Sequence, residues 1–287
     1  MKKIIESIDA KRKAFFVIHE GQKIGFYMTA RLAKTFYDYV QPGILVDFEI
    51  TGKEKKMGQI VFHQVAHFNL IKHLVTQHVY YDLNRLRNDM KDVLLKNTHY
   101  LFIDFEMTMP GYRTQAFCPQ IIQVGFCLSE FHQEPIRTGS MYVLPKEQDF
   151  LSKRTKRFLK LDEETFFQQA VDYRTFYETL KGMMDAYHPK LVVWGKNDMT
   201  ALHESYKIHQ VPPLTCDQDF IDLLKLHKDF FNLKDDLGLF KAFKEYYNEE
   251  HVQFHHAEDD AVVTKYVFDA FVQFMIQNGS KPESVNA

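Results

Sequence analysis

A short apolar segment that carries two acids constrains this chain more than any other stretch. Residues 100–108 read Tyr-Leu-Phe-Ile-Asp-Phe-Glu-Met-Thr, a run of aromatic and β-branched side chains that predicts a strand buried on both faces. Because side chains alternate along a strand, Asp104 and Glu106 share one face. Two such carboxylates repel each other, and burying either without a partner is costly. A metal cation would remove both penalties; the alternative is one solvated acid beside one that is salt-bridged.

The composition excludes several classes of protein. With 287 residues, 45% hydrophobic and 26% charged, the chain is globular and long enough for a large domain plus a small module. Its three cysteines, none in CxxC spacing, argue for a reducing compartment and against a disulfide framework or a zinc site. No run approaches the roughly 20 apolar residues of a membrane helix, and the first residues do not form a signal peptide. We therefore expect a cytoplasmic protein with no membrane partner.

Residues 1–75 form a candidate N-terminal module that differs in charge from the rest of the chain. They contain 12 Lys/Arg and 7 Asp/Glu, a net charge of +5, whereas the whole chain carries −2. The predicted elements are strands over 13–18, 24–28, 44–51 and 59–68 and a helix over 30–39. A small strand-rich unit with a basic turn at 52–56 resembles an oligonucleotide-binding (OB) barrel, which implies nucleic-acid binding. Phe26, Tyr27 and Phe62 would then stack on bases; the alternative is that these aromatics are core.

The remainder of the chain alternates strands and helices. Apolar residues at helical spacing predict a linker helix within 76–97, where we place the domain boundary. From residue 98 to 278 we expect a domain with an antiparallel meander followed by alternating helices and strands, and residues 279–287 are a polar tail. This order predicts the α/β class, a mixed sheet flanked by helices. The further strands are expected over 121–129, 139–144 and 190–195, and the closing helix over 257–277.

The closing helix places one acid toward the core. Its apolar residues form a stripe at about 100° per residue, and Asp260 falls in the middle of that stripe. Asp259 falls on the flank and Glu258 on the opposite face, where both favour the helix N-terminus. A carboxylate pointed inward must be paired, protonated or bound to metal, so Asp260 is a candidate metal ligand.

Two further candidates lie outside the strand and the closing helix. Asp198 follows the strand over 190–195 at a strand-to-helix switch, where α/β sites commonly lie; the alternative is a plain capping acid. His255 and His256 precede the closing helix, and a histidine beside acids is a common general base. Either could instead be a surface or capping residue.

Three motifs now resemble one family in order and spacing. Asp104-Phe105-Glu106, the segment 194–198 (Trp-Gly-Lys-Asn-Asp) and the segment 255–261 (His-His-Ala-Glu-Asp-Asp-Ala) are similar to the exonuclease motifs of the DEDDh 3′–5′ exonucleases, the DnaQ-like or ribonuclease T superfamily, which have the ribonuclease H-like fold. The resemblance covers about 98–278. The segment 119–125 also resembles the family's second strand, with Gln120 in place of the more usual Glu.

The resemblance implies a two-metal phosphodiester hydrolase. Asp104, Glu106, Asp198 and Asp260 would hold two Mg²⁺ or Mn²⁺ ions roughly 4 Å apart. One ion and His255 would generate the attacking hydroxide, and the other would stabilise the leaving 3′ oxygen. Met107 and Thr108 would lie beside the terminal nucleotide. His256 is the rival base, but its spacing to Asp260 is one residue short of the family pattern.

The resemblance therefore predicts a 3′–5′ exonuclease that releases nucleoside 5′-monophosphates from RNA or short single-stranded nucleic acid. Two alternatives stay open: a DNA exonuclease of the proofreading or repair type, and a catalytically silent nucleic-acid-binding scaffold. Loss of a motif acid would have favoured the scaffold, and none is lost. The partner in every case is a nucleic acid, and the sequence leaves the oligomeric state open.

Overall fold

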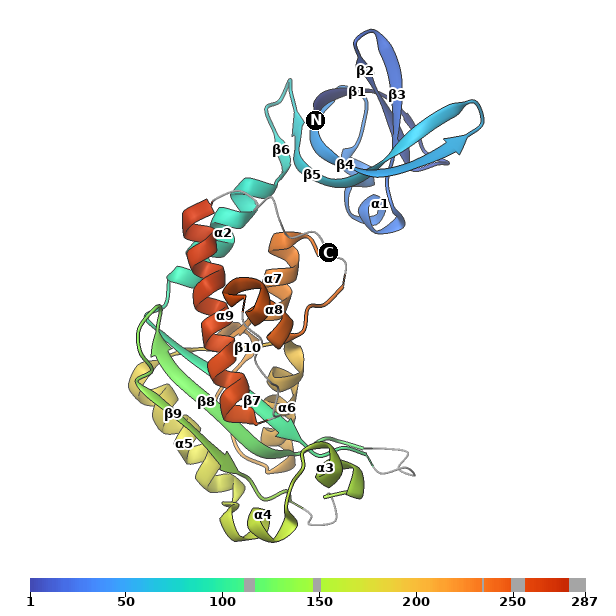
Figure 1. Ribbon diagram of the computed structural model, residues 1–287. Coiled ribbons are helices and arrows are strands. Elements are labelled where there is room, and N and C mark those ends of the chain that lie inside the picture. Colours follow the sequence, from blue (N-terminus) through green and yellow to red (C-terminus); the bar gives the residue numbers. More distant parts are fainter. Residues whose placement is uncertain (111–116, 147–150, 234, 249–255, 279–287) are drawn as a thin grey trace. The chain divides into compact units, whose positions relative to one another are not determined.

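The computed structural model describes residues 1–110, 117–146, 151–233, 235–248 and 256–278. The chain divides into two compact units, Met1–Asp89 and Met90–Ala287, which we describe separately (Figure 1). The division falls inside α2 (Leu83–Leu95), the helix that the sequence predicts within 76–97. Among the described residues, no helix is both long and apolar enough to cross a bilayer.

The first unit is a closed five-stranded barrel with one added strand. Its strands are β1 (Lys2–Asp9), β2 (Ala14–His19), β3 (Gln22–Tyr27), β4 (Ile44–Met57) and β5 (Ile60–His73). They pair in the order β3-β2-β1-β4-β5, and a parallel pairing of β3 with β5 closes the barrel. The chain between β3 and β4 forms α1 (Ala30–Phe36), capped by the Thr29 hydroxyl, and a 3₁₀ turn at Tyr37–Tyr39. The short β6 (Val79–Asp82) extends the sheet beside β5.

The barrel aromatics are mostly core, which corrects the stacking prediction for two of them. Phe26 is 1% exposed and packs in the barrel interior against Phe15 and Phe48. Phe62 is also 1% exposed, because its ring lies over Gly25, where no Cβ intervenes, and against Phe16. Of the three residues, only Tyr27 is partly exposed. Sequence spacing could not show this burial, because it depends on which distant strand lies beside each ring.

The second unit contains a mixed five-stranded sheet. Its strands are β7 (His99–Met107), β8 (Ile121–Glu130), β9 (Arg137–Tyr142), β10 (Lys190–Val193) and β11 (Phe220–Asp222). They lie in the order β11-β10-β7-β8-β9. The β7-β8-β9 part is an antiparallel meander, and β10 pairs parallel to both β7 and β11. The predicted α/β class with a mixed sheet is confirmed, and β7 lies at its centre.

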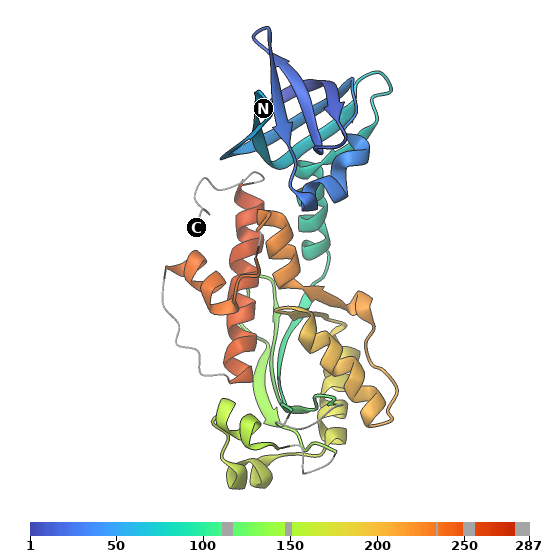
Figure 2. The ribbon, with the colours of Figure 1, turned by 90° about the vertical axis from the view of Figure 1, so that its right-hand side faces the viewer.

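Helices cover both faces of this sheet (Figures 1 and 2). One core is formed by side chains of β7 and β10 with α7 (Leu223–Phe231), α8 (Leu239–Tyr247) and α9 (Ala257–Asn278). The other core joins the opposite face to α5 (Tyr173–Tyr187) and α6 (Lys196–Ile208). Two short helices, α3 (Lys153–Phe158) and α4 (Glu163–Gln169), follow β9 in the chain. The strand β7 is therefore buried on both faces, as its composition predicts.

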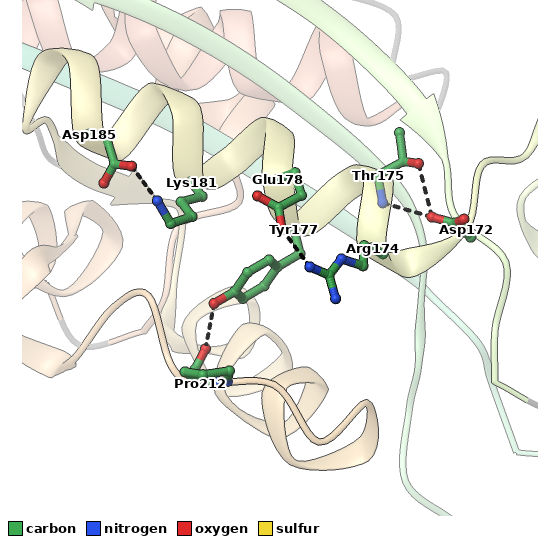
Figure 3. Close-up of polar contacts among 8 residues, drawn as sticks. All are labelled: Asp172, Arg174, Thr175, Tyr177, Glu178, Lys181, Asp185 and Pro212. Carbon is green, nitrogen blue, oxygen red and sulfur yellow. Dashed lines mark hydrogen bonds and ion pairs between the residues drawn. The ribbon is translucent and has the colours of Figure 1, made fainter.

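Helix α5 shows how these helices are held at their ends and along their length (Figure 3). The Asp172 carboxylate caps its N-terminus by accepting from the Thr175 backbone N–H at 2.7 Å. On the buried side, the Tyr177 hydroxyl donates to the carbonyl of Pro212, 3.1 Å away, in the segment that follows α6. Because α5 and α6 pack on the same face of the sheet, this bond helps to fix the position of α6, which carries Asp198.

Candidate metal centre

The two strand acids lie on one face of β7, as their spacing predicts. Asp104 pairs with Gly125 of β8, and Glu106 pairs with Gln123. Both acids are partly buried, whereas residues 100–103 and Phe105 of the same strand are buried. Carboxylate oxygens of Asp104, Glu106 and Asp260 all lie within 4.8 Å of one another. Three acids from two separate elements thus meet at one point.

Helix α6 brings Asp198 to the same strand. It begins after Gly195, whose φ of 101° is a conformation that L side chains rarely adopt, and Asp198 lies in its first turn. The Asp198 carboxylate is not the N-cap of α6, because that position is Gly195. It accepts instead from the backbone N–H of Phe105, with an N···Oδ1 distance of 3.1 Å. Since Phe105 lies between Asp104 and Glu106, this bond fixes Asp198 beside both.

Helix α9 brings Asp260, and a glycine permits its approach. Asp260 is 7% exposed in the first turn, and its backbone N–H donates to the His256 carbonyl at 3.1 Å. A Cβ at Gly125 would lie 1.9 Å from the carbonyl carbon of Ala257, closer than any side chain tolerates. The absent side chain at Gly125 therefore lets the start of α9 rest directly on β8, beside Asp104.

Burial and the neighbouring carboxylates raise the pKa of three of these acids. Burial is the largest cause for Asp104, whose pKa lies well above its usual range, and the charges of Asp198, Asp260 and Glu106 add to it. Burial, followed by the charges of Asp260 and Asp198, raises the pKa of Glu106 to about 8. The pKa of Asp198 rises to about 7, mainly through burial, although the Phe105 N–H opposes the rise. Without a cation, this site is poorly suited to hold its full negative charge.

The donor set fits divalent cations that prefer oxygen ligands. Every candidate donor is a carboxylate oxygen, the type that Mg²⁺ and Mn²⁺ bind, and among the described residues neither a cysteine nor a histidine belongs to the group within 4.8 Å. A divalent ion would compensate the mutual repulsion that raises these pKa values.

Only one of the two candidate histidines lies among the described residues. His255 lies outside the described residues. His256 is described and is half-buried, and its carbonyl accepts from Asp260 at the start of α9. Its position next to the helix start is consistent with a capping role for its backbone.

A pocket of about 480 Å³ lies beside the acids. Glu106, Met107 and Thr108 line it together with residues of α3 and α6. Met107 is half-buried, whereas Thr108 is 2% exposed and its hydroxyl accepts from the Gln120 backbone N–H at 2.9 Å. Both residues that the resemblance assigns to the terminal nucleotide therefore line this pocket, but the Thr108 hydroxyl is engaged in holding the end of β7 to the start of β8.

Several residues that line this pocket were not among the site residues predicted from the sequence. Asn197, Thr200, Ala201 and Glu204 lie on one face of α6, at the i, i+3, i+4 and i+7 spacing counted from Asn197. That spacing was a usable signal. Arg154 of α3 also lines the pocket; the basic run over 153–157 is visible in the sequence as a candidate phosphate contact, but its place at the pocket is not, because α3 is more than forty residues from either strand acid in the chain.

Comparison with known proteins agrees with the site. A family model described as Exonuclease (RNase_T) matches residues 101–268, more than half of the chain. The chain belongs to this exonuclease family. A curated relative, the probable 3′-5′ exonuclease KapD of Bacillus subtilis (strain 168), is 32% identical over 170 residues, which are 58% of this chain and 82% of the relative.

Solved structures share the fold of the second unit. The nuclease domain of 3′hExo, described as a DEDDh family member bound to rAMP, has a TM-score of 0.54 and 16% identity over 63% of this chain and 94% of that one. A structure described as 3′-end specific recognition of histone mRNA stem-loop by 3′-exonuclease has a TM-score of 0.53 and 16% identity over 63% and 83% of the two chains. Cell-death related nuclease 4 has a TM-score of 0.51 and 16% identity over 63% and 65%.

The predicted family and reaction are thereby confirmed. The chain is a 3′–5′ exonuclease of this family, a hydrolytic nuclease that acts on nucleic acid. Family membership implies divalent metal ions, and an acidic cluster is present on β7 and α9.

Proposed function

We propose that this chain removes nucleoside 5′-monophosphates from the 3′ end of RNA or short single-stranded nucleic acid. In this proposal Asp104, Glu106, Asp198 and Asp260 hold two Mg²⁺ or Mn²⁺ ions. The observation that carries it is the meeting of three carboxylates within 4.8 Å, with Asp198 bonded to the backbone between two of them. Two such ions, when bound, polarise the phosphate, activate water and stabilise the leaving oxygen.

In this proposal the residues of the chain act by positioning the ions and the terminal nucleotide. The bond from Phe105 N–H holds the Asp198 carboxylate in one orientation, so a ligand atom is in place before any ion arrives. The pocket beside Glu106 has room for a terminal nucleotide, and the half-buried Met107 offers an apolar surface to its sugar and base.

His255 is the proposed general base. In the sequence it lies two residues before Ala257, the first residue of α9. One of its ring nitrogens would accept the proton of the attacking water. His256 is the rival. The sequence spacing to Asp260 supports His255, and the backbone role of His256 at the helix start is consistent with that assignment.

RNA is the first substrate to test. Two structures of this fold are described as bound to rAMP or as recognising a histone mRNA stem-loop, and both descriptions concern those proteins. DNA degradation of the proofreading or repair type is the alternative.

The decisive experiment uses matched 5′-labelled RNA and DNA oligomers with Mg²⁺, Mn²⁺ or EDTA. A metal-dependent ladder that shortens from the 3′ end, absent in Asp104→Asn, supports the proposal, and the faster substrate identifies the preference. Binding without cleavage of either oligomer would point to the silent scaffold instead.

A second role is proposed for the barrel of residues 1–75, as a nucleic-acid-binding module. Its closed five-stranded topology, with a helix between β3 and β4, supports this role because small barrels of this kind include oligonucleotide binders. Lys53, Lys55 and Lys56 are exposed on the β4–β5 hairpin, next to the strand that carries Phe62. Replacing these three lysines by glutamine should raise KM for long oligomers more than for dinucleotides. An equal rise for both would contradict this role.

A further inference from the structure

Helix α3 carries an unusual concentration of positive charge beside an acidic centre. Four of its six residues are Lys or Arg. Nucleic acid is a polyanion, and it must approach a site with four carboxylates, so attraction is needed close to that site. The pocket shows that α3 is close, because Arg154 lines it together with Glu106.

The position of α3 is fixed by hydrogen bonds rather than left to its charges. The Thr155 hydroxyl accepts from the Met109 backbone N–H at 2.9 Å, and the Ser152 hydroxyl donates to the Met109 carbonyl at 3.1 Å. Met109 follows β7 by two residues. Thr155 is fully buried, so this side of α3 packs against the segment that follows β7.

The remaining side of α3 presents three basic side chains to solvent. At about 100° per residue, Lys153, Arg154 and Arg157 fall within an arc of about 100°, roughly opposite to Thr155. All three are exposed, and none has an ion-pair partner among the described residues. We call these three residues the α3 basic face.

The fourth base of the helix behaves differently. The Lys156 ammonium pairs with Glu163 of α4 at 2.7 Å, and the side chain is 28% exposed. Lys156 therefore has the same charge and the same helix as its neighbours but is already neutralised. It provides a matched control.

We propose that the α3 basic face binds the backbone phosphates of the substrate strand as it enters the pocket. Arg154 lies at the pocket itself, and Lys153 and Arg157, one turn apart, continue the positive surface outward. With a rise of about 1.5 Å per residue, Lys153 and Arg157 span about 6 Å along the helix, enough for about two successive phosphates. The contact is to phosphate and so holds RNA and DNA single strands alike.

The inference rests on the proposed function in one respect only, namely that the bound strand is the nucleic-acid substrate. Binding of that strand can be measured separately from its cleavage. Fluorescence anisotropy of a labelled oligouridylate or oligothymidylate is recorded in EDTA, between about 50 and 200 mM salt. We expect Lys153→Gln/Arg157→Gln to raise Kd about tenfold at the lower salt and Arg154→Gln about fivefold. The slope of log Kd against log salt should fall by about 1.4 in the double variant, since each single-strand phosphate contact contributes about 0.7.

Lys156, which is already paired with Glu163, supplies the control variant. Lys156→Gln should leave Kd within about twofold of the unmodified protein. The inference is wrong if the double variant binds as tightly as the unmodified chain, if Lys156→Gln weakens binding equally, or if the unmodified chain fails to bind at low salt. A chain that binds through this face but removes no nucleotide when Mg²⁺ or Mn²⁺ is added would overturn the proposed function and leave the α3 basic face standing.

Discussion

Asp104 of β7 pairs directly with Gly125 of β8, and Gly125 is the point at which α9 rests on the sheet. A side chain there would lie 1.9 Å from the Ala257 carbonyl carbon. The same cross-strand pair therefore sets the position of one strand acid and of the helix that carries Asp260. The geometry of the metal centre depends on a residue that has no functional group.

Replacing Gly125 by alanine should damage both stability and activity. The added methyl group must displace the α9 backbone, and overpacking of this kind costs about 3 kcal/mol. We expect the melting temperature to fall by on the order of 10 °C and metal-dependent cleavage to fall further than stability alone explains, because Asp260 moves with the helix. Gly182→Ala on α5, where nothing lies within 4 Å, is the control and should be neutral or slightly stabilising. A Gly125→Ala protein with unchanged stability would contradict the close contact.

Asp198→Asn should remove activity while stabilising the metal-free protein. The amide oxygen can still accept from the Phe105 N–H, but the charge that binds metal is lost. Because burial raises the pKa of Asp198 from 3.8 to about 7, its ionisation lowers the free energy of unfolding progressively between these two pH values, and the loss is complete above about pH 7. We expect cleavage to fall by about 10³-fold or more and the melting temperature in EDTA at pH 8 to rise. Asp259 is exposed and one residue from Asp260, so Asp259→Asn is the control and should change neither cleavage nor the melting temperature. Equal effects of the two variants would contradict the assignment of Asp198 as a metal ligand.

The stability of the metal-free protein should depend on pH in a defined direction. Burial and two neighbouring carboxylates raise the pKa of Glu106 from 4.5 to about 8. Between these values the folded state binds more protons than the unfolded state, so stability is present at low pH and is lost as the pH rises through about 8. Thermal melts in EDTA from pH 5 to pH 8, in which acid-labile ion pairs elsewhere are already ionised, measure this loss.

Divalent ions should reverse this loss. Since the carboxylates must be deprotonated to bind metal, the rise in melting temperature on adding Mg²⁺ or Mn²⁺ should be larger at pH 8 than at pH 6, and binding should release protons. Calorimetry in buffers of different ionisation enthalpy measures that release. Glu106→Gln should weaken both effects. A metal response independent of pH would show that these acids are not the ligands.

The choice between the two histidines can be tested by substitution. His255→Ala should lower kcat by about 10²–10⁴-fold while leaving the metal-induced rise in melting temperature intact, because a general base does not hold the ions. It should also remove the acidic limb of the profile of kcat against pH, since that limb reports the base. His256→Ala is the matched variant and should retain this limb. The opposite pattern would assign the base to His256.

Much of the metal centre follows from local periodicity. The strand over 100–108 and the shared face of Asp104 and Glu106 follow from the two-residue repeat of a strand, and the inward position of Asp260 follows from the helical repeat of α9. Both repeats are consequences of backbone geometry alone, so a single sequence suffices to predict them. The order of strands and helices likewise predicted the mixed sheet.

Other features were decided only by the tertiary structure. Phe62 is buried because the distant Gly25 and Phe16 lie against it, and β1 was missed because its exposed Ile4 breaks the apolar alternation until β4 is placed beside it. Arg154 reaches the pocket because Met109 anchors Ser152 and Thr155. The sequence by itself determined which side chains share a face within one element. Only the fold decided which elements meet, because those contacts join residues far apart in the chain, where no local repeat operates.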